Sequence, residues 1–226
     1  HALERITGAV KNSYGFIYGF HKAKGHTQYR SADSFARMLI DLNKCVAPKL
    51  YVMDGIVAME GNGPGSGDPV PMNVLLMSTD PVALDSVFSR LVYLKPEMVP
   101  TNYHGEKMGL GTWKEEEITL LIPDGEISMA EAVKKYGNPA FNVDRTEVRK
   151  NIWTRMAGAL NIFQKKPYIE AGKCVRCGIC VQSCPVPGKA VDFRKGKGKP
   201  PVYDYRKCIR CFCCQEMCPK KAIKVK

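Results

Sequence analysis

The chain has 226 residues, of which 45% are hydrophobic and 25% charged, and its formal net charge at pH 7 is +12. This composition is typical of a globular protein and excludes a collagen, a coiled coil and a small disulfide scaffold. No stretch of 18 apolar residues occurs, so the sequence predicts no membrane-spanning helix. The first residues also lack the basic and apolar regions of a secretory signal peptide.

A helix signal and a strand signal follow each other early in the chain. Apolar side chains in residues 31–47 follow the helical period, which predicts a helix with Ser31 or Asp33 as its N-cap. The same spacing places Cys45 on the apolar, buried face of that helix. Residues 49–54 form a short apolar run that ends in Asp-Gly, which predicts a buried strand.

Strand and helix signals continue to alternate after residue 70. Apolar runs predict strands over 73–77 and 117–122. Between them a helix is predicted over 80–93, because Asp80 is a good N-cap and Pro81 fits the first helical turn.

The alternation predicts the fold class of residues 1–165. Ser128 and Glu131 form a capping box that begins another helix, and a last helix is predicted over 151–163. Strands that alternate with helices favour an α/β domain with a mostly parallel or mixed sheet covered by helices.

A glycine-rich segment follows the strand predicted at 49–54. Binding sites in α/β sheets gather at the carboxyl ends of strands, and glycines let backbone N–H groups approach a ligand closely. We therefore expect a weak anion-binding or substrate-binding loop formed by Gly61, Gly63, Gly65 and Gly67. A long glycine turn is the alternative, and the spacing matches neither a Walker A loop nor a dinucleotide fingerprint.

Four polar side chains are candidates for catalysis in this domain. Asp54 and Glu60, beside the glycines, could bind a cation or act as acid and base. Lys11 could bind an anionic substrate, and His26 could carry a proton or bind a metal. The alternatives are a turn-forming aspartate, solvated surface charges and a histidine that binds nothing.

The last part of the chain differs from the rest in charge and in cysteine content. Residues 171–226 hold 14 Lys and Arg and 3 Asp and Glu, whereas residues 1–170 hold 20 and 19. Nine of the ten cysteines lie in this basic segment. A segment of this size forms a poor hydrophobic core alone, so we expect a covalent or metal staple in a second domain at 166–226.

Two cysteine runs carry the strongest functional signal. Each reads C-x2-C-x2-C-x3-C followed by proline, which is the run of bacterial ferredoxins. In that pattern the fourth cysteine of each run binds the cluster of the other run. We therefore assign one 4Fe–4S cluster to Cys174, Cys177, Cys180 and Cys218, and a second to Cys208, Cys211, Cys214 and Cys184.

An internal repeat supports this assignment. The two runs lie 34 residues apart, and each is followed by Lys-Ala and a β-branched residue. The repeat resembles the two-cluster bacterial ferredoxin domain, which implies a small α+β ferredoxin-like domain. Disulfides would need an oxidising compartment, and zinc usually binds two C-x2-C pairs. Cys213, beside Cys214, is either a spare ligand or a buried apolar side chain.

The positive charge of the second domain indicates the kind of partner. The loop between the runs carries Arg194, Lys195, Lys197 and Lys199. We expect it to dock an acidic redox partner such as a ferredoxin or flavodoxin, with a solvated flexible loop as the alternative. Nucleic acid is less favoured as a partner, because no aromatic residues are interleaved with these charges.

Three motifs in the first domain resemble the domain of unknown function 362 family. They are Thr7-Gly-Ala-Val-Lys-Asn12, the segment from Asp54 to Pro64, and Asp80-Pro-Val-Ala-Leu-Asp85. Members of that family often carry a two-cluster ferredoxin module at the C-terminus, as this chain does. The resemblance implies that the N-terminal part of the family domain is missing here. We expect either an incomplete sheet or an N-terminal part that is a separate or removed segment.

These observations predict electron transfer through two 4Fe–4S clusters. The clusters would pass electrons to or from the α/β domain, which would hold a small-molecule substrate or cofactor of an oxidoreductase. The alternatives are a non-catalytic electron carrier or docking subunit and, less favoured, an iron–sulfur regulator that binds nucleic acid. Because such clusters are sensitive to oxygen and no export signal is visible, we expect a cytoplasmic protein.

Overall fold

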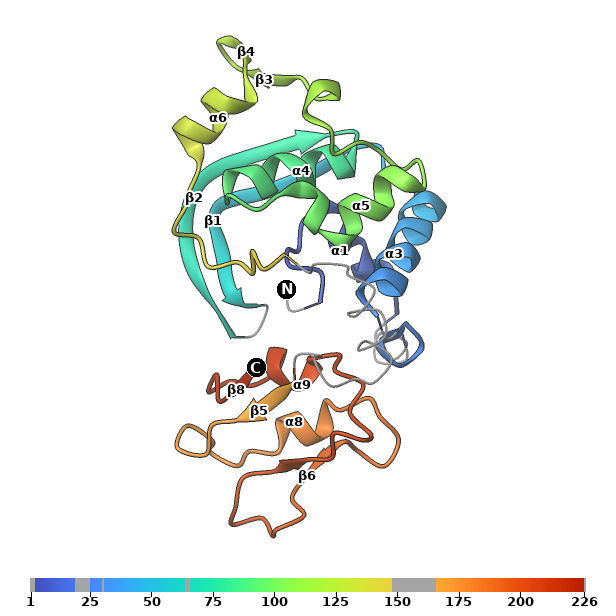
Figure 1. The fold of residues 1–226 in the computed structure, drawn as a ribbon, viewed down its shortest axis with the longest axis vertical. Helices are drawn as coiled ribbons and strands as arrows, with labels where there is room; N and C mark the ends of the chain where they lie inside the picture. Colours follow the sequence, from blue (N-terminus) through green and yellow to red (C-terminus); the bar gives the residue numbers. More distant parts are fainter. Residues whose placement is uncertain (1–2, 19–24, 30, 64–65, 148–165, 226) are drawn as a thin grey trace. The chain divides into compact units, whose positions relative to one another are not determined.

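The computed structural model describes residues 3–18, 25–29, 31–63, 66–147 and 166–225. The chain divides into two compact units (Figure 1), the first made of His1–Gly63 with Gly67–Arg145 and the second of Pro64–Ser66 with Thr146–Lys226. The helix predicted over 151–163 lies outside the described residues, and the domain boundary expected after residue 165 stays a prediction.

The first unit is built around a long hairpin. Strands β1 (Tyr51–Asn62) and β2 (Ser66–Ser78) pair in a two-stranded sheet and run in opposite directions (Figure 1). The strands predicted over 49–54 and 73–77 are therefore parts of one hairpin, with no helix between them. The expected helix-covered parallel or mixed sheet is not seen in the described part of the chain, where each sheet has two strands.

The glycine-rich segment belongs largely to this hairpin, which corrects its prediction as an open loop. Gly61, still in β1, has a φ of +73°, a left-handed conformation that side chains disfavour. A Cβ on Gly63 or Gly67 would overlap the side chain of Met59. A side chain at either position would thus disturb the end of the hairpin. Gly65 lies outside the described residues, and the ligand-binding role of the four glycines stays a prediction.

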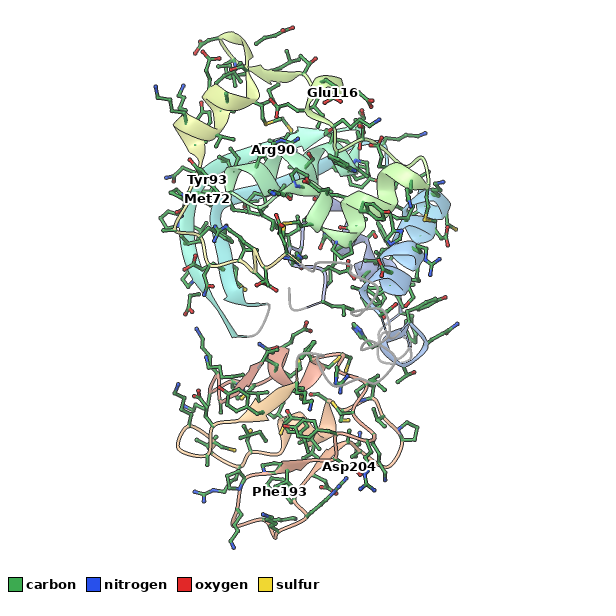
Figure 2. The ribbon with its side chains drawn as sticks, viewed as in Figure 1. Met72, Arg90, Tyr93, Glu116, Phe193 and Asp204 are labelled. Carbon is green, nitrogen blue, oxygen red and sulfur yellow. The ribbon has the colours of Figure 1, made fainter. Side chains whose placement is uncertain are left out.

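Three helices pack together, and one of them contacts the hairpin. They are α3 (Ala32–Val46), α4 (Pro81–Leu91) and α5 (Pro100–Lys107). Helix α5 contacts α3 and α4, and α4 also contacts β1 (Figure 1). One core joins the hairpin to α4 and includes Met72, labelled in Figure 2, with Val74, Val87, Phe88 and Leu91. A second core joins α3 to the N-terminal residues and includes Val10, Tyr14, Phe35, Leu39 and Ile40.

Two of the predicted helix caps are confirmed in this group. Ser31 Oγ accepts a hydrogen bond of 3.1 Å from the backbone N–H of Ser34 at the start of α3. Asp80 Oδ1 accepts a hydrogen bond of 2.7 Å from the backbone N–H of Val82 at the start of α4. Each cap satisfies a backbone donor that the first helical turn leaves without an intrahelical acceptor.

Short turns complete the helical part of the first unit. The N-terminal turns α1 (Ala9–Asn12) and η1 (Ser13–Phe16) pack against α3, and α1 also packs against α4. The turn η2 (Pro96–Met98) joins α4 to α5, and η3 (Glu115–Glu117) precedes β3.

The strand predicted over 117–122 is shorter in the structure. Strand β3 (Leu120–Ile122) pairs antiparallel with β4 (Gly125–Ile127), a strand that the sequence did not indicate. Helix α6 (Met129–Tyr136) follows. Its predicted capping box is confirmed, with Glu131 N donating to Ser128 Oγ at 3.2 Å.

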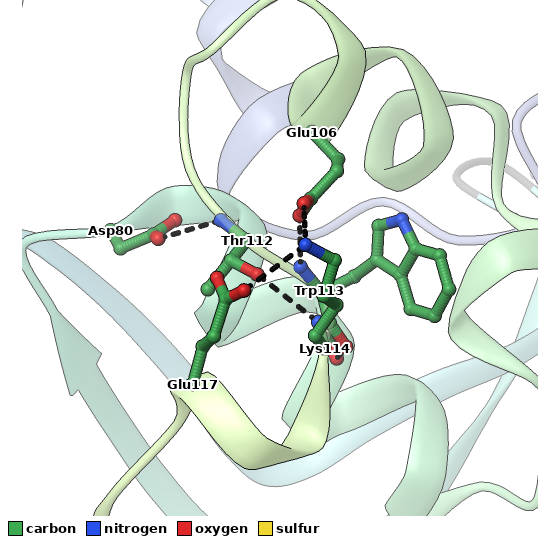
Figure 3. Close-up of polar contacts among 7 residues, drawn as sticks. Asp80, Glu106, Thr112, Trp113, Lys114 and Glu117 are labelled. Carbon is green, nitrogen blue, oxygen red and sulfur yellow. Dashed lines mark hydrogen bonds and ion pairs between the residues drawn. The ribbon is translucent and has the colours of Figure 1, made fainter.

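Carboxylates hold the loop that follows α5 (Figure 3). Asp80, whose Oδ1 caps α4, accepts a second hydrogen bond on Oδ2 from the backbone N–H of Thr112 at 2.9 Å. Glu106 accepts a hydrogen bond of 3.1 Å from the backbone N–H of Trp113 and pairs with Lys114 at 2.9 Å. Asp80 therefore acts as both a helix cap and a loop anchor.

The second unit has two small antiparallel sheets and two short helices. Strand β5 (Pro167–Ile169) pairs with β8 (Ile223–Val225), and β6 (Val191–Asp192) pairs with β7 (Val202–Tyr203). Helices α8 (Ile179–Gln182) and α9 (Cys213–Glu216) contact each other. This is a small α+β arrangement, as the sequence predicted.

Asp204, labelled in Figure 2, fixes the start of the second cysteine run. Its backbone N–H donates to Ala190 O at 2.7 Å, and its own carbonyl accepts from Cys208 N at 3.0 Å. Its carboxylate pairs with Arg194 at 3.4 Å. One residue thus connects the second run to the strand and loop that follow the first run.

Candidate iron–sulfur centres

Each cysteine run begins with a turn of left-handed backbone. In the first run Arg176 and Gly178 have φ values of 59° and 78°, and α8 begins directly after Gly178. In the second run Arg210 and Phe212 have φ values of 58° and 61°, and α9 begins directly after Phe212. The repeat that the sequence predicts is therefore present in the backbone. Phe212, the counterpart of Gly178, keeps the left-handed conformation, although this conformation costs a non-glycine residue about 1 kcal/mol.

A cavity that is open in part to solvent is lined by cysteines of both runs. Three of them belong to the first run, namely Cys174, Cys177 and Cys180, and the fourth is Cys218 of the second run. Much of the remaining wall is aliphatic and comes from Ile169, Val175, Ile179, Ala222 and Ile223. The structure thus brings together four thiols that lie up to 44 positions apart in the sequence.

Four thiols around a cavity fit an iron–sulfur cube. A single zinc ion would bind all its thiolates directly, with Zn–S distances of about 2.3 Å. In the part of the chain that the structure describes, no group of three or more His, Cys, Asp or Glu side chains is arranged to hold a metal ion, so the number of clusters stays a prediction. A cube keeps its thiolates apart at separate iron atoms, which is consistent with a cavity between them.

The other four cysteines of the two runs influence one another electrostatically. Burial raises the pKa of Cys208, and the charges of Cys211 and Cys184 raise it further. Burial also raises the pKa of Cys214 to about 12, and Cys211 and Cys208 contribute to this shift. Cys184 of the first run therefore lies near Cys208 of the second, while the assignment of the eight ligands stays a prediction.

The fourth cysteine of each run accepts a hydrogen bond from the backbone. Ala190 N donates to Cys184 Sγ and Ala222 N donates to Cys218 Sγ, both at 3.3 Å. These alanines belong to the repeated Lys-Ala motif that the sequence showed without indicating its role. Donors to sulfur favour the thiolate that a cluster needs.

Tyr203 is a neighbour of the cysteines that sequence reasoning missed. Its hydroxyl lies 3.0 Å from Cys214 Sγ, and its ring stacks on Tyr205 with the centroids 5.6 Å apart. Burial raises the pKa of the Tyr203 hydroxyl, and the charge of Cys214 adds to this effect. The cysteine spacing contains no signal for this contact, because Tyr203 precedes Cys208 and comes from β7.

The two remaining cysteines differ from each other. Cys213 is half-buried, and its Sγ lies 4.0 Å from the carbonyl oxygen of Cys211. Cys45 is exposed, which corrects its expected place in the core. The last turn of α3 extends past the core, since the neighbouring Val46 is 42% exposed as well.

The structure does not bring Asp54 and Glu60 together. Both lie on β1, and six residues of strand separate their Cα atoms by about 20 Å. Asp54 is exposed and accepts a local hydrogen bond of 3.0 Å from Ile56 N. Glu60 accepts a hydrogen bond of 2.7 Å from Asn142 N, which ties the segment after α6 to the end of the hairpin.

His26 packs against aromatic side chains, and Lys11 acts on a buried carboxyl group. His26 is buried, stacks on Phe35 with the ring centroids 4.9 Å apart and meets the edge of Tyr14 at 5.6 Å. Lys11 belongs to α1, and its positive charge acts on the buried carboxyl group of Glu4. Their catalytic roles stay predictions.

Asp85 joins two of the motifs that the sequence singled out. It is fully buried and accepts hydrogen bonds from Ala9 N at 2.5 Å and from Val10 N at 3.0 Å. A Cβ on Gly8 would overlap its carboxylate, so only glycine fits there. Burial raises the pKa of Asp85 to about 7, although both backbone donors oppose the shift.

Comparison with known protein families finds one match that includes the motifs joined by Asp85 and a second that includes the cysteine runs. Residues 1–90 match the family described as Domain of unknown function (DUF362). Residues 166–219 match the 4Fe-4S dicluster domain, which supports an iron–sulfur electron-transfer role for the second unit. Both resemblances drawn from the motifs are thereby confirmed. The DUF362 match ends within α4, so residues 91–165 lie between the two matched segments.

One curated relative extends the comparison. A thylakoid-associated protein of Synechocystis sp. is 40% identical over 111 residues, which cover 49% of this chain and 35% of that protein. The chain thus spans about a third of the length of this relative. No solved structure matches the chain. None of the helices that the structure describes has the length and apolar character needed to span a bilayer.

Proposed function

We propose that the second unit is an electron-transfer domain with two 4Fe–4S clusters bound across the two cysteine runs. The observation that carries this proposal is the cavity lined by Cys174, Cys177, Cys180 and Cys218. A fourth ligand from the other run is the arrangement expected of a two-cluster ferredoxin pattern. The second cluster would be held by Cys208, Cys211, Cys214 and Cys184.

The residues around the thiols provide what an electron carrier of this kind needs. When bound, each cluster supplies one-electron redox chemistry. The aliphatic wall of the cavity limits the access of water, and Ala190 and Ala222 direct backbone N–H groups at Cys184 and Cys218. The excess of Lys and Arg in residues 171–226 offsets the negative charge that thiolates and sulfide bring.

The first unit has two candidate roles in this proposal. In one, it holds a substrate or cofactor of an oxidoreductase and exchanges electrons with the clusters. In the other, it is a docking platform, and the chain is a non-catalytic electron carrier. The separation of Asp54 and Glu60 along β1 favours the second role, because the expected acid and base do not meet. We retain the cytoplasm as the proposed location.

Iron and acid-labile sulfide analysis, with EPR after dithionite reduction, tests the number of clusters. Protein purified without oxygen is expected to contain about eight iron and eight sulfide per chain. Zinc without sulfide would overturn the proposal, because the cysteines would then only staple the fold.

Double variants test the crossed ligand sets. Cys184→Ser combined with Cys208→Ser removes two ligands of one proposed cluster, so about half of the iron is expected to remain. Cys184→Ser combined with Cys174→Ser damages both clusters, so little iron is expected to remain. Cys45→Ser, at an exposed position outside both runs, is the control. The reverse pattern in the two double variants would show that each run binds its own cluster.

A further inference from the structure

The two proposed clusters are not equally accessible from outside. Of the eight proposed ligand cysteines, all of which the structure describes, Cys177 is exposed and the others are half-buried or buried. Its counterpart in the second run, Cys211, is half-buried. Val175, two positions before Cys177, is 54% exposed, and Val175 and Cys177 both line the cavity. The cavity of the first run therefore opens to solvent at Cys177.

Positive charge surrounds this opening. Arg176 and Lys220 line the cavity and are exposed. Arg176 Nη1 donates a hydrogen bond of 2.9 Å to Gly198 O, and this contact anchors the basic loop between the runs at the same edge. Lys197 and Lys199 flank Gly198 and are exposed. We call Arg176, Lys197, Lys199 and Lys220 the basic rim.

The lysines of the basic rim have no carboxylate partner within the described residues. Nearby cations outside the rim differ in this respect. Lys173 pairs with Glu170 at 2.6 Å, and Arg194 pairs with Asp204 at 3.4 Å. The rim charges are thus available to carboxylates of another molecule, whereas these neighbours are neutralised locally.

We propose that the basic rim around Cys177 is the docking surface for an acidic one-electron carrier protein of the flavodoxin kind. This inference rests on the proposed function and adds where the partner binds and which cluster exchanges electrons with it. In the transfer step the reduced carrier loses one electron and the second unit gains one, with no bond made or broken. Docking at Cys177 brings the carrier to the only exposed thiol among the eight proposed ligands, all of which the structure describes.

The surface fits a protein better than a nucleic acid. An apolar centre with a charged rim is the usual anatomy of a protein interface, and here Val175 and Pro219 lie inside the rim. Nucleic-acid sites of single strands need aromatic side chains on which bases stack. None of the described residues that line this cavity is aromatic.

A stopped-flow experiment tests the docking surface. Fully reduced flavodoxin, free of dithionite, is mixed with the anaerobically purified full chain, and the rate of reduction of the chain is measured. Two variants remove charge from the rim in different ways, Arg176→Gln with Lys220→Gln at the cavity and Lys197→Gln with Lys199→Gln on the loop. Each is expected to lower the second-order rate constant about tenfold at low ionic strength, and the difference is expected to vanish in high salt. The loop variant leaves every cavity residue unchanged, so it guards against a folding defect.

Lys207→Gln provides the matched control. Lys207 is exposed and precedes the first cysteine of the second run, and its loss is expected to leave the rate constant within about twofold. If Lys207→Gln lowered the rate constant as much as the rim variants do, docking would lie elsewhere and the proposal would be overturned. Unchanged rates in both rim variants would also overturn it.

A separate readout keeps the proposed function distinguishable from the docking surface. Iron content and the EPR signal after dithionite reduction are expected to be the same in all variants and in the unmodified chain. Normal signals with no rim effect contradict the docking surface alone, whereas missing iron contradicts the proposed function. Salt-dependent binding of single-stranded DNA that is lost in both rim variants, with unchanged flavodoxin rates, would assign the rim to a nucleic acid instead.

Discussion

Tyr203 Oη lies 3.0 Å from Cys214 Sγ, so the last residue of β7 places a hydroxyl group against a proposed cluster ligand. With Cys214 as a thiolate, the hydroxyl is the donor of this hydrogen bond. A donor to sulfur stabilises the more negative, reduced state and raises the reduction potential. The two proposed clusters therefore differ in their surroundings, since the first cavity has no aromatic residue in its described lining.

Tyr203→Phe is expected to lower the potential of the cluster held by Cys214. A hydrogen bond contributes about 1 kcal/mol, which corresponds to about 40 mV for a one-electron couple. Redox titration followed by EPR measures this shift, with the iron content unchanged. Tyr205→Phe is the control, because the Tyr205 hydroxyl donates to Pro167 O at 2.9 Å. Equal potentials in both variants and the unmodified chain would show that the Tyr203 hydroxyl has no effect on the cluster.

The stability of the first unit is expected to fall as pH rises. Asp85 has a pKa of about 7 in the folded state, well above its ordinary value of 3.8, and Glu4 has a pKa of about 8, raised from 4.5 mainly by burial. A raised carboxyl pKa means that the folded state holds the proton more tightly. The stabilisation is complete below about pH 4 and is lost as pH rises through 7 and 8, at about 1.4 kcal/mol for each unit of pKa shift.

Denaturant unfolding followed by tryptophan fluorescence at pH 5 and pH 8.5 measures this dependence. The free energy of unfolding is expected to be lower at pH 8.5 by a few kcal/mol. Asp85→Asn cannot ionise, so its dependence on pH is expected to be smaller than that of the unmodified chain. A variant with the full pH dependence would show that Asp85 does not titrate in this range.

Gly111→Ala is expected to destabilise the first unit. A Cβ at this position would overlap the carboxylate of Asp80, which caps α4 and holds Thr112 N at 2.9 Å. Loss of a helix cap costs about 1 kcal/mol, and displacement of the loop adds to it. Gly15→Ala is the control, because a Cβ there meets no atom within 4 Å. Thermal unfolding compares the two variants, and an equal midpoint in both would contradict the role given to Gly111.

Glu60 is expected to act as an anchor for the segment after α6. Glu60→Ala removes the acceptor of the 2.7 Å hydrogen bond from Asn142 N and is expected to cost about 1 kcal/mol. Glu60→Gln keeps an acceptor oxygen and is expected to cost less. Hydrogen exchange at Asn142 measures the loss directly. Loss of an enzymatic activity in Glu60→Gln, with normal exchange, would instead return Glu60 to the catalytic role.

Local signals in the sequence were sufficient for the helix caps and for the match to the 4Fe-4S dicluster domain, whereas the assignment of the ligands stays a prediction. Ser31, Asp80 and Ser128 cap the helices that follow them, because a cap depends on contacts within three residues. The repeated cysteine spacing indicated the 4Fe–4S module for the same reason, since the first three cysteines of each run are only three positions apart.

Contacts between distant segments needed the tertiary structure. An apolar run predicts a strand without its partner, so β1 and β2 were expected in a parallel or mixed sheet and not in one hairpin. Likewise, glycine composition gave no sign that Gly63 and Gly67 leave room for the side chain of Met59. The burial of Asp85 against α1 and the contact of Tyr203 with Cys214 depend on residues 11 to 76 positions away, and the exposure of Cys45 depends on the extent of the core. The sequence by itself indicated the 4Fe–4S module and determined the capped helices, and only folding decided which side chains surround them.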